Sequence, residues 1–148
     1  MKKSILACLV ILFALTACEG PVGMPGEDGV MYWDIRVITV EDRDWELWED
    51  ADGLNPYYRC VVRWDDLDSY ICQKGLVTGY MILGAGQKDE VQTPMPYVYH
   101  RENRHGEQWT ETYYYDYMPG SIAFYCRYSD FMVDESPGRQ QFRIVLNW

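Results

Sequence analysis

Basic residues are scarce in this 148-residue chain, which carries 13 Lys and Arg against 23 Asp and Glu and a formal net charge of −10. Nucleic acids and anionic lipid surfaces attract proteins through clusters of positive charge, which this composition does not supply. The balance therefore excludes a nucleic-acid partner.

Sequence signatures of common catalytic sites are also missing. The chain has no nucleophile elbow, zinc motif, P-loop or dinucleotide-binding fingerprint. Paired carboxylates of the kind used in glycoside hydrolysis can be found in any chain this acidic, so they carry no information. We expect no cofactor, no bound metal and no enzymatic activity.

The longest apolar run, Ile5 to Leu15, is too short to cross about 30 Å of hydrocarbon and follows Lys2 and Lys3. This arrangement predicts an export signal over residues 1–17, whose removal would change the net charge from −10 to −12. The four residues that begin at the end of this run, Leu15-Thr16-Ala17-Cys18, resemble the bacterial lipobox, which implies cleavage before Cys18 and acylation of Cys18. The alternative is an ordinary secretory signal with an incidental cysteine. Because two or more acyl chains hold a protein stably in a membrane, we expect a lipoprotein of the cell envelope, in the outer membrane. The sequence does not decide which leaflet of that membrane holds it.

A Gly-X-Y repeat occupies Gly20 to Gly29, within the predicted spacer 18–30, and has proline in both the X and the Y positions. The pattern is collagen-like, and one interpretation is a trimerising triple helix. Three triplets offer too few contacts between chains to offset their ordering entropy, so we favour a flexible spacer. In polyproline II conformation, at about 3.1 Å per residue, it would reach up to ~30 Å.

From Met31 onward, apolar and polar residues alternate with the period of half-buried strands. The first two such rows are Met31, Trp33, Ile35 and Val37, then Tyr58, Cys60, Val62 and Trp64. An apolar run from Leu76 to Leu83 indicates a central strand. Pro119-Gly120 and Pro137-Gly138 each predict a turn that would let the chain cross between sheets. We therefore expect an all-β fold over residues 31–148: a single antiparallel β-sandwich of about six to eight strands, immunoglobulin-like in architecture without a commitment to that topology.

Three cysteines, Cys60, Cys72 and Cys126, remain in the predicted domain after Cys8 leaves with the signal and Cys18 takes the lipid. An exported protein permits disulfides, and an odd number allows at most one bridge within the chain. The sequence does not choose among the three pairings. Cysteine is also a small buried hydrophobe, so three free thiols are an equal alternative.

Several short sequences spread over the chain carry a resemblance. They are Cys18-Glu19-Gly20-Pro21, Trp45-Glu46-Leu47, Leu54-Asn55, Tyr57-Tyr58, Trp109-Thr110, Pro119-Gly120-Ser121, Tyr128-Ser129-Asp130-Phe131 and Val145-Leu146-Asn147-Trp148. Together they resemble small uncharacterised lipoproteins of the Bacteroidales, with a collagen-like segment after the lipidated cysteine and one β-rich domain. The resemblance covers nearly the full length and implies an envelope location, with no established activity. The three cysteines of the predicted domain are not part of that pattern.

Acidic triplets and the histidine pair are the candidates for metal binding. The triplets are Glu41-Asp42-Arg43-Asp44, Glu49-Asp50-Ala51-Asp52 and Asp65-Asp66-Leu67-Asp68. Carboxylates spaced in this way can converge on Ca²⁺, but the bidentate Glu of a calcium loop is missing, so we favour solvated turns. A site with His100, His105 and Glu102 or Glu107 is conceivable, but a polar loop of this kind fixes no geometry.

Aromatic residues make up 16% of the chain, with thirteen Tyr and six Trp. Those that we expect to point outward are candidate contact residues for a protein or a sugar: Trp45, Trp48, Tyr97, Tyr99 and Tyr114, with Tyr125 beside them. The alternative is that they serve as strand formers only. The sequence thus favours a membrane-tethered, non-enzymatic binding, adhesion or assembly module with an envelope protein partner. A carbohydrate-binding accessory lipoprotein with a glycan partner is the alternative.

Overall fold

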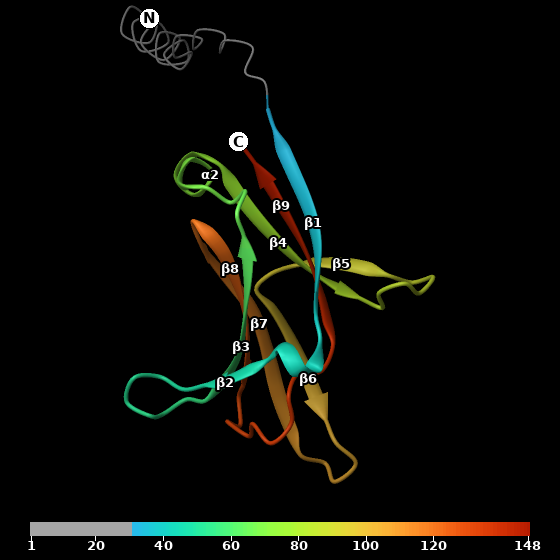
Figure 1. Ribbon diagram of the computed structural model, residues 1–148. Helices are drawn as coiled ribbons and strands as arrows, with labels where there is room; N and C mark the ends of the chain where they lie inside the picture. Colours follow the sequence, from blue (N-terminus) through green and yellow to red (C-terminus); the bar gives the residue numbers. More distant parts are fainter. Residues whose placement is uncertain (1–30) are drawn as a thin grey trace, which may run out of the picture. The chain divides into compact units, whose positions relative to one another are not determined.

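The computed structural model describes residues 31–148, which form one antiparallel β-sandwich (Figure 1). The predicted signal peptide 1–17, the predicted lipid site at Cys18 and the Gly-X-Y spacer 18–30 lie outside the described residues. Within residues 31–148 the elements are β1 (Trp33–Val40), η1 (Asp42–Asp44), β2 (Glu46–Trp48), β3 (Tyr57–Trp64), α2 (Ser69–Lys74), β4 (Leu76–Leu83), β5 (Val91–Pro94), β6 (Tyr97–Glu102), β7 (Gln108–Met118), β8 (Gly120–Tyr128) and β9 (Gln140–Asn147). None of the helices in this part of the chain is long and apolar enough to cross a membrane.

Two sheets make the sandwich. The four-stranded sheet A has the order β1-β9-β4-β5, and the five-stranded sheet B has the order β2-β3-β8-β7-β6. All pairs are antiparallel. The expected all-β sandwich is confirmed, with more strands than expected because β2 and β5, of three and four residues, are too short to leave an alternating pattern.

The core lies where β8 and β9 face each other across the two sheets. Phe124 of β8 and Phe142 of β9, both fully buried, stack with ring centroids 4.2 Å apart. The expected alternation of Tyr58, Cys60, Val62 and Trp64 on β3 is confirmed, since three of these side chains belong to this core and that of Val62 packs against it. The apolar run from Leu76 to Leu83 is β4, which lies between β9 and β5 as a central strand should.

On β1 the apolar row faces solvent and the polar row faces inward, which is the reverse of the orientation expected for a half-buried strand. Trp33, Ile35 and Val37 are 71%, 45% and 58% exposed, whereas Asp34 and Arg36 are less exposed and lie on the opposite face of β1. A strand has only two faces, so side chains that hold one row inward send the other row to solvent. The apolar row of β1 therefore lies on the outside of sheet A.

The turn at Pro119-Gly120 also differs from the expectation. It joins β7 directly to β8 within sheet B, with Met118 opposite Ser121, so the predicted crossing between sheets at this turn is wrong. Gly120 has φ +87°, which a glycine adopts without strain and which closes the hairpin in two residues. The chain changes sheets later, between β8 and β9, in the loop that contains Pro137-Gly138, so the crossing expected at that second turn is confirmed.

Candidate functional site

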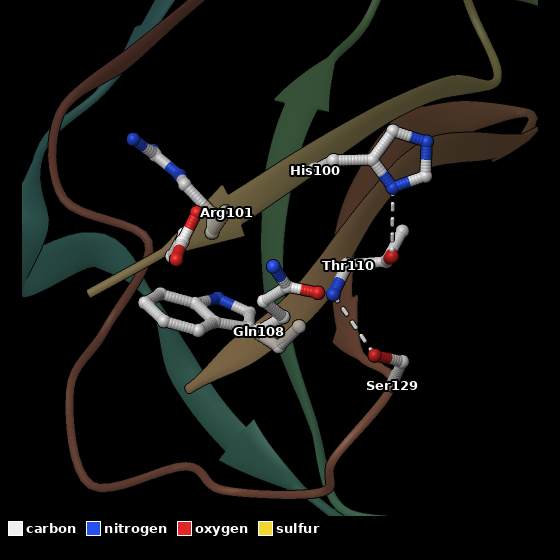
Figure 2. A pocket seen from close by; sticks show the side chains of 7 residues that line it. His100, Arg101, Gln108, Thr110 and Ser129 are labelled. Carbon is white, nitrogen blue, oxygen red and sulfur yellow. Dashed lines mark hydrogen bonds between the residues drawn. The ribbon is translucent and has the colours of Figure 1, made fainter. Parts of the chain in front are cut away.

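A hollow opens at the end of the sandwich, lined by the β6–β7 hairpin and by the loop between β8 and β9. Its volume is about 910 Å³. We call it the hairpin hollow; its lining residues come from β6, β7 and their turn, from the end of β8, and from the loop at 130–137. A smaller depression of about 380 Å³, which Figure 2 shows, adjoins it and shares Arg101, Glu102, Gln108 and Trp109.

The wall of the hollow holds a buried carboxylate, that of Glu111, whose side chain is 7% exposed. Arg101 donates from Nε to Oε1 at 3.0 Å and from Nη2 to Oε2 at 3.3 Å, and the Tyr113 hydroxyl donates to Oε2 at 2.9 Å. Trp109 Nε1 adds a longer contact to Oε1 at 3.4 Å. A buried charge is costly unless it is paired and hydrogen-bonded, and both oxygens of Glu111 meet this condition.

Strand register brings these side chains together. In the β6–β7 pair Arg101 lies opposite Trp109 and Tyr99 lies opposite Glu111, so Arg101 is the diagonal neighbour of Glu111 on the same face. The Arg101 guanidinium lies 4.3 Å from the centroid of the Tyr99 ring. Burial by itself would lower the pKa of Arg101, but hydrogen bonds to Glu111 and its charge outweigh this and raise it, so the guanidinium stays charged.

Groups beneath the pair hold their protons tightly. Burial raises the pKa of Cys126 to about 12. Burial, followed by the nearby Cys126 and Glu111, raises the pKa of Tyr113 and of Tyr128. At neutral pH these groups are a neutral thiol and neutral phenols, so none is an activated nucleophile.

The rim of the hollow is strongly acidic. Arg101 is the one basic residue of its lining, and Glu111 already neutralises it. The remaining charged residues of the lining are all carboxylates: Glu102, Glu107, Asp130, Asp134 and Glu135. Residues 31–148 contain no group of three or more His, Cys, Asp and Glu side chains arranged to hold a metal ion. The arrangement can attract a cation or donate and accept hydrogen bonds, and its acidic rim produces a negative potential.

The aromatic residues singled out from sequence do not line this hollow. Trp45 is buried and donates from Nε1 to the Gly138 carbonyl at 2.8 Å, so it belongs to the core and does not point outward as expected. Tyr97 is also misassigned, because it packs against the core from the inner face of β6, and Tyr99 shares that face and stacks on it at 6.1 Å. Trp48, 45% exposed on β2, is outward as expected.

Tyr114 belongs to an aromatic row on the outer face of sheet B. It stacks on Tyr125 with ring centroids 4.7 Å apart and nearly parallel planes, and its hydroxyl accepts from Arg127 Nε at 3.0 Å. Arg127 in turn lies 4.4 Å from the centroid of Tyr57. Tyr125 is 9% exposed despite its outward direction, because these neighbours cover it. The aromatic residues that do line the hollow are Trp109 and Tyr128, neither of which was singled out from the sequence as a contact residue.

All three cysteines of the described part are free. Cys60 lies opposite Phe124 and Cys126 lies opposite Tyr58, so both thiols are on one sheet at diagonal positions. Diagonal neighbours in a sheet are farther apart than a disulfide allows, and an immunoglobulin-type bridge would join the two sheets instead. Cys72 is on α2. Of the two alternatives left by the sequence, one disulfide or three free thiols, the structure has three free thiols.

The acidic triplets and the histidines have local roles. Asp52 accepts from the Leu54 amide and Asp50 accepts from Asn55, which closes this loop as a turn, and Asp50 also pairs with Arg127 of β8. His100 on β6 has Nδ1 3.1 Å from Thr110 Oγ1, as the dashed line in Figure 2 marks. His105 lies in the β6–β7 turn.

Comparisons with protein families, with curated proteins and with solved structures found no match to this chain.

Proposed function

We propose that this chain is a lipid-anchored protein of the cell envelope that acts as a non-enzymatic binding or assembly module. Its ligand is a positively charged segment of a partner protein, and its site is the hairpin hollow. The observation that carries the proposal is that the one arginine of the hollow is neutralised by Glu111, which leaves a rim of carboxylates alone.

Electrostatics support a cationic ligand. Among residues 31–148, the ion pairs of the protein engage none of Glu102, Asp134 and Glu135. Opposite charge on a partner would accelerate encounter and set orientation, and Trp109 offers a ring face to a lysine or arginine. The net charge of −10 acts in the same direction at longer range.

The state of the buried groups supports binding over catalysis. Both Glu111 oxygens accept from protein donors, and burial keeps the Cys126 thiol and the Tyr113 hydroxyl protonated at neutral pH. A general base or a nucleophile needs the opposite arrangement, with a proton that is easily removed.

A glycan ligand is the second candidate, and one observation favours it. Trp109 lies in the lining beside the amides of Asn103 and Gln108, and a planar ring with amides and carboxylates can stack on a sugar and bind its hydroxyls. A neutral glycan would bind independently of salt, whereas a cationic protein segment would be released by it.

Pull-down from detergent-solubilised envelope, at low and at high salt, tests the proposal. The variant Asp134→Asn with Glu135→Gln removes two charges from the rim, and Asp65→Asn with Asp89→Asn removes two exposed charges elsewhere. We expect the wild-type chain to retain a protein partner at low salt and to release it at high salt. The rim variant should not retain this partner, whereas the control variant should. A soluble glycan that binds the wild-type chain equally at both salt concentrations would favour the second candidate.

The anchor is tested separately. With Cys18→Ser, the chain should stay an uncleaved or soluble precursor and leave the detergent phase. Membrane partitioning that the substitution does not reduce would overturn the lipoprotein assignment.

A further inference from the structure

Strand β1 is the edge of sheet A, with β9 on one side and no strand on the other within residues 31–148 (Figure 1). Its outward row, Trp33, Ile35 and Val37, is apolar and exposed. The apolar surface continues across the sheet, because Ile35 lies opposite Val145 of β9 and the exposed Leu76 of β4 lies beyond Asn147. A long, exposed, apolar edge strand is a template for pairing with another chain.

The inner row of β1 fixes this orientation. Arg36 lies with its guanidinium 4.4 Å from the centroid of the Trp64 ring, donates from Nε to Asp34 at 3.2 Å, and pairs with Asp66 of the loop after β3. Rotating β1 to bury the apolar row would break the two contacts that leave the strand, those with Trp64 and Asp66. The outward direction of the apolar row is therefore built into the fold.

The backbone of the same residues is available for pairing. Tyr32 and Trp148 exchange two backbone hydrogen bonds, at 2.8 and 3.0 Å. Antiparallel pairing alternates, so the even-numbered residues of β1 direct their N–H and C=O groups to β9 and the odd-numbered residues direct theirs to the free edge. Trp33, Ile35 and Val37 thus present both apolar side chains and unpaired backbone groups.

Strand β1 is also the longest edge strand of the described residues. Within the described residues the other edge strands are β2 with three residues, β5 with four including Pro94, and β6 with six. Short strands and proline block edge pairing, and β1, with eight residues and no proline, has neither protection.

We propose that β1 pairs antiparallel with β1 of a second copy of this chain, with Ile35 opposite Ile35, to form a symmetric dimer. The sequence Trp33-Asp34-Ile35-Arg36-Val37 is complementary to itself in this register. Trp33 lies opposite Val37 of the second copy, and Asp34 lies opposite its Arg36. A two-fold axis through Ile35 repeats both pairs, and the two four-stranded sheets become one continuous sheet.

Charge selects this register. An inward charge on an edge strand normally prevents pairing, because pairing would bury it without a partner. Here a slip of two residues would oppose Asp34 to Asp34 or Arg36 to Arg36, and a slip of one would set the apolar row against the charged row. The register centred on Ile35 joins each charge to its opposite and matches the free backbone groups. The inference is independent of the hairpin hollow.

Cysteine cross-linking of the full-length chain in intact cells tests the proposal. We expect Ile35→Cys to yield a product of twice the chain mass with a short thiol-specific cross-linker. The matched control is Val61→Cys, 51% exposed on the outer face of sheet B, which should yield none. Co-expressed Trp33→Cys and Val37→Cys chains should cross-link with each other at least several-fold more than either does alone.

A dissociating substitution completes the test. Adding Val37→Lys to Ile35→Cys should reduce the cross-linked product at least tenfold, while Leu47→Lys, at a 55% exposed position on β2, should leave it unchanged. Equal products from Ile35→Cys and Val61→Cys would overturn the proposal. So would a cross-linked product of the Ile35→Cys chain with any other mass, which would assign the edge to a different protein.

Discussion

The phenol of Tyr115 crosses the interior of the sandwich from β7 and ends on the backbone of β4 beside Gly79. Its hydroxyl donates to the Val77 carbonyl at 2.9 Å and accepts from the Gly79 amide at 3.0 Å. A Cβ on residue 79 would stand 2.5 Å from Cε1 of the same ring. Glycine is therefore required here by a close approach between the two sheets, and one tyrosine joins the sheets by packing and by hydrogen bonds.

Gly79→Ala should destabilise the protein by about 1–3 kcal/mol, the usual cost of overpacking a core, because the Tyr115 ring has little room to retreat. Urea unfolding of both proteins measures the difference. In a Tyr115→Ala background the penalty should shrink, since the ring atoms are gone and only Met95 Cε, at 2.8 Å and at the end of a flexible side chain, still crowds the added Cβ. An undiminished penalty in that background would place the crowding elsewhere.

Thiol reactivity should divide the three cysteines of the sandwich. Burial raises the pKa of Cys60 to about 11 and that of Cys126 to about 12, so neither supplies a thiolate near neutral pH. Cys72, partly exposed on α2, should therefore react first with iodoacetamide at about pH 8. Peptide mass spectrometry identifies the labelled site, and rapid labelling of Cys126 in the native protein would contradict the packing described.

The same thiols predict a loss of stability at alkaline pH. Their folded pKa values lie above the ordinary value of 9.0, so between about pH 9 and 12 the unfolded chain releases protons that the folded chain retains. The contribution of these two thiols to the free energy of unfolding should be fully present below about pH 9 and should fall by about a few kcal/mol as the pH rises to about 12. The Cys126→Ala variant should show a shallower decline in urea titrations at several pH values. A decline as steep as that of the wild-type protein would rule out Cys126 as a source.

Alternation predicted the strands of this fold but not which row of each strand faces inward. On β1 the outcome depends on Arg36, whose partners Trp64 and Asp66 lie about 30 residues away in the sequence. A pattern of period two is the same whichever row is buried, so only these tertiary contacts decide it. The apolar run of β4 was predictable because a central strand buries both faces and leaves no such choice.

The hairpin hollow was hidden for a related reason. Trp109, Glu111 and Tyr113 share one parity on β7, which places a carboxylate in an inward row. In a chain with 23 acidic residues that signal does not stand out without the register that brings Arg101 to Glu111. The sequence left free thiols as one of two alternatives. The relative positions of Cys60 and Cys126 depend on the register between β3 and β8, which the sequence does not give.

Replacing either member of the Arg101–Glu111 pair alone should reduce stability, but by unequal amounts. Glu111→Leu leaves Arg101, whose side chain is 41% exposed, to water, so the expected loss of stability is about 1–2 kcal/mol. Arg101→Met leaves the carboxylate of Glu111 buried without a countercharge, and we expect a larger loss of about 3 kcal/mol. Urea unfolding measures both.

The double variant Arg101→Met with Glu111→Leu separates the pair interaction from the cost of an orphaned charge. Removing both charges leaves neither group unpaired, so the double variant should be more stable than Arg101→Met alone, although the Tyr113 hydroxyl loses its acceptor. A coupling free energy of at least about 1 kcal/mol in the cycle would agree with the bidentate geometry. Strict additivity of the two single losses would instead mean that water already compensates Glu111 in the folded state, and the hairpin hollow would then be a wetter and more open site than its hydrogen bonds indicate.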